Sequence, residues 1–219
     1  FVSFVPAKRL RWNRDKRERR DAGDARIGLV VFGIAVDRAV PFGHQCWWLA
    51  VTSPDAATAA DVLGLIRRKR VTWGHGVELA YGGAVFVAPP IGPWVLVPGR
   101  GLPDAASPGF LEWVVGLSAR LGHVQFFETH RFTGTCAWVL AVGGRLRRAY
   151  HFDGAGVPLF EGEVTADEVA LGVGTRPESD DDEAWWDTVP GEDDVLALAR
   201  RWSVDPMTIE GVATDGAGI

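Results

Sequence analysis

Three strand-like segments joined by two tight turns constrain the fold of this 219-residue chain more than any other feature. The segments cover 124–132, 136–142 and 145–152, and each carries aromatic or β-branched residues typical of strands. A Thr-Gly-Thr turn at 133–135 separates the first two, and Gly143-Gly144 separates the last two. Because a parallel connection needs a dozen or more residues, strands joined this closely must pair antiparallel. The pattern therefore predicts an antiparallel meander.

Apolar periodicity and turn signals along the rest of the chain predict further strands and helices. We expect strands at 27–36, 46–51, 94–97 and 157–161, a hairpin over 77–88 that turns at Gly82-Gly83, and helices at 53–65, 108–121, 165–171 and 192–202. The fold class is therefore α+β, a mostly antiparallel sheet of six or more strands with the helices at 53–65 and 108–121 packed on it. Trp94, Trp113 and Trp138 should lie in the core.

A short internal similarity leaves open a duplication within this fold. The segment WVLVPGRGL at 94–102 resembles WVLAVGGRL at 138–146. Each follows a predicted helix and then a strand, so two helix–strand–strand units could lie side by side in one sheet.

The charge of the chain is unevenly distributed, although the net charge is only −5. Residues 8–20 hold eight basic and two acidic residues, whereas 178–194 hold nine acidic and no basic ones. We interpret 1–26 as a basic N-terminal arm and 27–219 as a single α+β domain with an acidic loop at 174–194. The overall acidity argues against nucleic acid as a partner.

Cysteine usage and hydropathy favour a cytoplasmic protein. Cys46 and Cys136 are too few for a disulfide framework, and no signal peptide is evident. The longest apolar run, at 27–36, has ten residues, whereas a membrane span needs about 20. A bias towards Ala, Arg, Val, Gly and Asp, with three Lys and a single Met, suggests a GC-rich bacterial genome.

The richest polar cluster lies in one predicted strand. The chain lacks the short motifs of dinucleotide enzymes, P-loop NTPases, α/β-hydrolases and common zinc sites. Alternation along the strand places Glu128 and His130 on one face, and Thr129 and Arg131 on the other. Glu128, His130 and Arg131 could support acid–base chemistry or hold an anion, whereas the structural alternative is a cross-strand ion pair.

Cys136 and His151 form a second candidate pair. If Val142 pairs with Arg145 across the Gly143-Gly144 turn, Cys136 faces His151. An imidazolium beside a thiol lowers the thiol pKa, which would activate a nucleophile, although a buried structural cysteine is the alternative. His151 and Asp153 are too few to bind a metal without Glu128 or His130, so we expect neither a metal nor a cofactor.

The acidic segment carries the candidate partner-binding residues. Asp180, Asp181, Asp182 and Glu183 are followed directly by Trp185 and Trp186. Two adjacent indoles in a polar loop must either dock onto the protein itself or contact a partner. We expect 178–194 to dock the basic arm at 8–20 or a basic partner. The alternatives are a solvated loop, a divalent cation on the carboxylates, and indoles that cover a groove of this chain.

Four segments resemble a family of uncharacterised bacterial proteins of about this length. They are YGGAVFVAPPIGPWVLV at 81–97, VQFFETHR at 124–131, RAY at 148–150 and WSVDP at 202–206. The resemblance covers roughly residues 45–210. It implies a bacterial source and a single domain, and no activity comes with it.

These observations favour a binding protein over an enzyme. We expect a bacterial cytoplasmic protein of immunity or accessory type that binds a protein partner through an aromatic and acidic surface. The alternative is a small-molecule enzyme that uses Glu128, His130 and Arg131 in a Trp-lined pocket. A deep pocket around His130 would favour the enzyme, and exposed Trp185 and Trp186 would favour the binding protein.

Overall fold

The structure is a computed structural model that describes residues 37–178 and 183–219. The described residues belong to one compact unit. The predicted arm at 1–26, the predicted strand at 27–36 and Asp180, Asp181 and Asp182 lie outside them. None of the described helices is long and apolar enough to cross a membrane.

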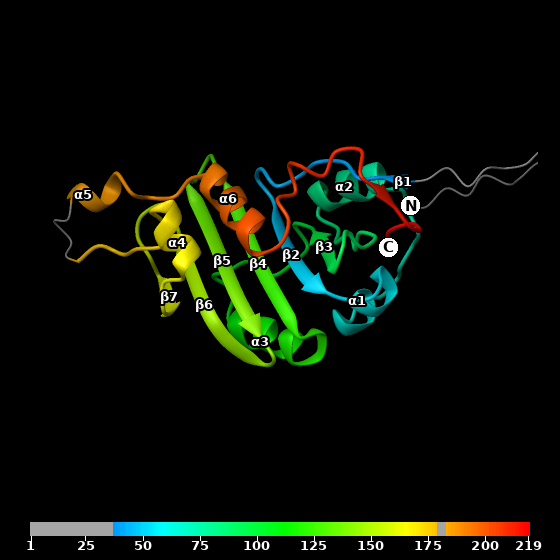
Figure 1. The fold of residues 1–219 in the computed structure, drawn as a ribbon, viewed down its shortest axis with the longest axis horizontal. Coiled ribbons are helices and arrows are strands. Elements are labelled where there is room, and N and C mark those ends of the chain that lie inside the picture. The colour runs from blue at the N-terminus through cyan, green and yellow to red at the C-terminus, as the bar shows by residue number, and fades with distance from the viewer. Residues whose placement is uncertain (1–36, 179–182) are drawn as a thin grey trace, which may run out of the picture. The chain divides into compact units, whose positions relative to one another are not determined.

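A six-stranded antiparallel sheet forms the centre of the fold, as predicted (Figure 1). The strand order is β3-β2-β4-β5-β6-β7, with β2 (Trp47–Thr52), β3 (Trp94–Pro98), β4 (His123–His130), β5 (Thr135–Val142), β6 (Arg145–Phe152) and β7 (Leu159–Gly162). The meander predicted from the two tight turns is β4-β5-β6. Two short strands, β1 (Asp37–Arg38) and β8 (Ala213–Thr214), pair separately.

Helices cover both faces of this sheet, and each face has its own apolar core (Figure 1). Helices α4 (Ala166–Leu171) and α6 (Glu192–Trp202) lie on one face, which we call the α6 face. Helix α3 (Phe110–Leu121) packs on the opposite, α3 face, together with α1 (Ala56–Val62). The short helix α5 (Glu183–Trp186) follows α4 in the chain.

The two predicted packing helices are present but begin later than expected. Helix α3 buries Phe110, Val114 and Leu117, which recur at helical spacing, and it ends at Gly122, whose φ is +83°. The predicted helix at 53–65 is reduced to α1, and its cap is Asp55 instead of Ser53. The Asp55 carboxylate accepts from the backbone N–H of Thr58, which a Ser53 side chain two residues earlier does not do.

The predicted hairpin at 77–88 is wrong, because its first half is a helix. Helix α2 (Trp73–Tyr81) buries Trp73, Gly76, Val77 and Ala80, a helical spacing that the two glycines obscured. Gly82 caps this helix and Gly83 has a φ of +101°, so the Gly-Gly pair ends a helix instead of turning a hairpin. Residues 84–88 then run extended, and Phe86 and Ala88 bond to Pro98 and Leu96.

The predicted tryptophan core is correct in part. Trp138 is fully buried, whereas Trp94 and Trp113 are only partly buried.

The two segments of the proposed duplication occupy different positions in the sheet. Trp94 begins the edge strand β3, after which a loop leads to α3, while Trp138 lies inside β5, which a hairpin joins to β6.

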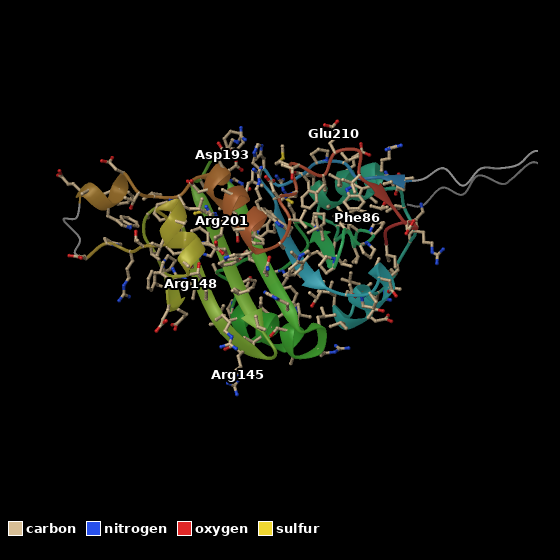
Figure 2. All side chains as sticks on the ribbon, in the orientation of Figure 1. Phe86, Arg145, Arg148, Asp193, Arg201 and Glu210 are labelled. Atoms are coloured by element: carbon tan, nitrogen blue, oxygen red, sulfur yellow. The ribbon has the colours of Figure 1, made fainter. Side chains whose placement is uncertain are left out.

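A buried ion pair fixes α4 to the α6 face of the sheet. Arg148 of β6, labelled in Figure 2, and Glu168 of α4 have no exposed side-chain surface. Arg148 Nε donates to Glu168 Oε1 at 2.8 Å. The Trp138 indole N–H donates to the same oxygen at 2.8 Å. Arg148 Nη2 donates to the Gly174 carbonyl, and the guanidinium lies 4.3 Å from the Phe160 ring centroid. One residue of β6 thus holds α4, β7 and the chain beyond α4.

Removing one partner of this pair should strongly destabilise the fold. Glu168→Ala leaves the Arg148 guanidinium buried without a counter-charge, so we expect a loss of about 3–5 kcal/mol in the free energy of unfolding. Urea denaturation measures it. The control is Glu163→Ala, which removes an exposed carboxylate and should cost less than about 0.5 kcal/mol. Equal midpoints for the two variants would contradict the role of the pair.

Candidate functional site

The predicted catalytic residues gather at one end of the sheet, which we call the hairpin end. It comprises the β4–β5 hairpin (128–137), the end of β6 (151–152) and the start of α6 with the residues before it (189–194). Antiparallel pairing brings these segments together because β4 ends where β5 begins and where β6 ends. The sheet then divides the predicted residues between its two faces.

Cys136 and His151 do not face each other, contrary to the prediction. Val142 pairs with Arg145 as expected, but the register shifts between Leu140 and Ala141, so that Cys136 pairs with Phe152 and His151 with Ala137. Since successive side chains point to opposite faces, this shift by one residue places Cys136 on the α6 face and His151 on the α3 face. The predicted thiol–imidazole pair is therefore absent.

On the α6 face, the hairpin end borders an open hollow of about 730 Å³. His130, Arg131, Gly134, Thr135, Cys136, Phe152 and the segment 189–194 line it. The hollow thus joins three predicted residues, His130, Arg131 and Cys136, to the acidic start of α6. Glu128 and His151 do not line it.

An ion pair ties the hairpin to α6 at this hollow. Arg131 Nε donates to Glu192 Oε2 at 2.7 Å, and the other Glu192 oxygen accepts from the backbone N–H of Gln45 at 2.7 Å. Although partial burial opposes it, these bonds lower the pKa of Glu192, with Thr129 and the Arg131 charge adding to the effect. Arg131 is thereby engaged within the protein, which makes it a positioning group for the hairpin.

Cys136 is a structural thiol at this hollow. Burial raises its pKa to about 12, and the charges of Asp194 and Glu128 act in the same direction. Its Sγ lies 3.6 Å from the Pro190 carbonyl, and the side chain is almost completely buried. Because the thiolate is the nucleophile, this environment suppresses the reactivity that the sequence left open.

Glu128 and His151 lie on the α3 face, in one row across the sheet. Glu128 pairs with Ala137 and Ala137 with His151, so one small side chain separates them. Glu128 is 5% exposed and accepts from the backbone N–H of Ala105 at 3.3 Å. Burial raises its pKa to about 7, aided by Asp104, and burial lowers the pKa of His151, which Asp153 and Asp104 partly offset.

Exposed aromatic side chains flank the hairpin end. Phe132, in the turn after β4, is 80% exposed, and Trp186 is 50% exposed. Trp185 is buried, and both indoles contact Phe152, with ring centroids 5.9 and 6.2 Å away. Trp185 thus anchors α5 to the end of β6, while Trp186 presents surface to solvent.

Sequence reasoning missed Phe132 and Phe152. Phe132 stands directly before the Thr-Gly-Thr turn, so its place at a hairpin tip was the signal for exposure. Phe152 gave no such signal, because its part in the hollow depends on the register shift in the β5–β6 pairing between Leu140 and Ala141. In the described part of the chain, no three His, Cys, Asp or Glu side chains converge to hold a metal ion.

Comparisons with protein-family models, with curated proteins and with solved structures found no match to this chain. The geometry of the hairpin end therefore supplies the argument about function.

Replacing Glu128 should remove a pH dependence of stability. Because the folded chain holds the Glu128 proton more tightly than the unfolded chain, raising the pH from about 4.5 to about 7 destabilises the fold. Glu128→Gln removes this contribution. The free energy of unfolding of the variant minus that of wild type should therefore be about 2–3 kcal/mol more favourable to the variant at pH 8 than at pH 4. Urea unfolding at both pH values measures it.

Subtracting the wild-type pH profile of stability from that of Glu128→Gln leaves only the contribution of Glu128. His151, with its lowered pKa, acts in the opposite direction but is common to both. Glu161→Gln, an exposed change on β7, should leave the pH profile as in wild type. Parallel profiles for wild type and Glu128→Gln would contradict the raised pKa.

Proposed function

We propose that this chain is a protein-binding protein that uses the hairpin end to bind a basic segment of a partner. The observation that carries the proposal is the combination of two exposed aromatic side chains, Phe132 and Trp186, with an acidic border around one hollow. Exposed aromatics beside a concavity are typical of interface anchors.

The charge around the hollow indicates the sign of the partner. The described residues 183–194 carry Glu183, Asp187, Glu192, Asp193 and Asp194 and no basic residue. Glu192 is engaged by Arg131, whereas the Asp193 side chain is fully exposed and has only a long contact of 4.0 Å to His44 Nε2 (Figure 2). Unneutralised carboxylates attract a basic segment and steer its approach.

The aromatic side chains would provide most of the affinity. Exposed charge pairs contribute only about 0–1 kcal/mol each, so the carboxylates alone cannot hold a partner. Phe132 is 80% exposed and Trp186 50% exposed, so each still has apolar surface that a partner can cover. At about 25 cal/mol per Å² that surface contributes a few kcal/mol before the entropic costs of association are subtracted. We therefore assign affinity to Phe132 and Trp186 and specificity to the acidic residues.

The proposal includes the type and setting of the protein. An acidic, aromatic binding surface suits an immunity or accessory protein of the bacterial cytoplasm, and the composition favours a bacterial source. Asp180, Asp181 and Asp182 precede α5 in the sequence and lie outside the described residues, so the proposal rests on the acidic residues from Glu183 onward.

A second candidate function, small-molecule acid–base catalysis, is favoured by one observation. The pKa of Glu128, about 7, suits a general acid or base, and burial favours the neutral form of His151, which lies beyond Ala137 in the same row across the sheet. Against it, Glu128 is buried and accepts a hydrogen bond from the backbone N–H of Ala105. His130 and Arg131 line the hollow on the α6 face, which Glu128 does not reach. The predicted triad of Glu128, His130 and Arg131 is thus not assembled around one cavity.

Site-specific photocrosslinking tests the binding function and captures the partner in the same step. A photoreactive phenylalanine at position 132 or 186, introduced in the source cells, should give an adduct with one and the same protein. Position 66 provides a matched control, because Ile66 is 81% exposed on a different loop. Either no adduct, or the same adduct from all three positions, would contradict the proposal.

Affinity measurements on the crosslinked partner test the division of roles. Phe132→Ala and Trp186→Ala should each weaken binding about ten-fold or more, with Ile66→Ala unchanged. Asp193→Asn should chiefly reduce the salt dependence of the association rate. If the two aromatic changes leave the Kd unaltered, the hairpin end is not the interface. An adduct to this chain's own residues 8–20 would identify the arm as the occupant.

A further inference from the structure

A second hollow lies away from the hairpin end, between the α1–α2 loop, α2 and the extended segment 84–86. Its volume is about 300 Å³, which is at the lower end of the range for small-ligand pockets. Its apolar lining includes Leu65, Ile66, Val71, Leu79, Ala84, Val85, Phe86 and Ile219. Leu79 is 42% exposed although it belongs to α2, so the hollow presents apolar surface to solvent.

Cations border one side of this hollow. Arg67, Arg68 and Lys69 line it, and Arg70 follows directly. Arg68 is engaged within the protein, because its guanidinium pairs with Asp61 and donates to the carbonyls of Leu65 and Ala60. Among the described residues, the side chains of Arg67 and Lys69 have no hydrogen-bond or ion-pair partner. Two positive charges at the hollow therefore have no counter-charge from a described side chain.

Nearby carboxylates do not neutralise these cations. Asp61 is paired with Arg68, and Glu78 pairs with His75 on α2 at 3.4 Å. Among residues 37–178 and 183–219, no acidic side chain lines the hollow. The apolar surface and the uncompensated positive charge thus occur together.

The backbone holds the cationic side of the hollow in an unusual conformation. Arg67 has a φ of +57°, and in the described part of the chain only one other non-glycine residue, Gln45, has a positive φ. This turn leaves the adjacent Ile66 81% exposed. Non-glycine residues adopt this region at a cost, and such positions gather at binding sites.

We propose that this hollow binds a single anionic amphiphile, a fatty carboxylate, with the alkyl chain on the apolar lining and the carboxylate at Arg67 and Lys69. The concave shape and small volume suit one alkyl chain. They suit neither a flat bilayer surface nor an acidic amphipathic helix, which needs a long groove. This site is independent of the proposed binding function of the hairpin end.

Titration calorimetry with dodecanoate, below its micellar concentration, tests the proposal on the full chain. We expect one dodecanoate per chain and weaker binding of the uncharged dodecanol. The double variant Arg67→Ser with Lys69→Ser should weaken dodecanoate binding about three- to ten-fold and leave dodecanol binding unchanged. Leu79→Asp should abolish binding of both, and Leu79→Ser should weaken both if the aspartate variant misfolds.

A charge-matched control at another place on the surface separates binding at this hollow from a general effect of the net charge. The double variant Arg145→Ser with Arg147→Ser removes two exposed cations from β6, of which Arg145 is labelled in Figure 2, and it should bind dodecanoate as wild type does. The proposal is overturned by equal losses in the two double variants, by equal affinity for dodecanoate and dodecanol, or by binding to anionic vesicles without binding of the monomer.

Discussion

The buried ion pair between Arg148 and Glu168 is the constraint on which the α6 face depends. Burying two charges is costly unless their geometry is good and their remaining donors and acceptors are satisfied. Here Arg148 also donates to Gly174, and Glu168 also accepts from Trp138 and from the backbone N–H of Thr165. The pair thereby fixes α4 on the sheet. Helix α4 packs on α6, with Arg201 of α6 paired to Asp167 of α4, so the position of α6 follows from the same interaction.

The proposed binding surface derives its shape from this arrangement. The start of α6 forms one side of the hollow at the hairpin end, and the Arg131–Glu192 ion pair joins it to the β4–β5 hairpin. Trp185 packs on Phe152 and so holds α5 at the same end of the sheet. The elements that carry Phe132 and Trp186 are thus held in place by contacts with the sheet and with α6. A surface that is already ordered loses little conformational entropy when a partner binds.

The sequence predicted most of the sheet and less of the site. Short Gly-containing turns at 133–135 and 143–144 were sufficient to predict the β4-β5-β6 meander, because they leave only antiparallel pairing. The residue pairs across β5 and β6 were not predictable, since the register shift near Leu140 has no sequence signal, and it separates Cys136 from His151. Helix α2 was mistaken for a strand because Gly82-Gly83 is compatible with a hairpin turn and with a helix end. Phe132 and the start of α6 come together through tertiary contacts that local patterns do not encode.

Hydrogen exchange of the Trp138 indole N–H tests the central role of the buried pair most directly. This proton is donated to Glu168 Oε1, beside Arg148, in the fully buried centre of the α6 face. If the rest of that face depends on the interaction, the proton exchanges only when the whole domain unfolds. Its free energy of exchange then equals the global free energy of unfolding and falls with denaturant at the same slope. Exchange through a local opening, with a much smaller free energy and little dependence on denaturant, would contradict the account.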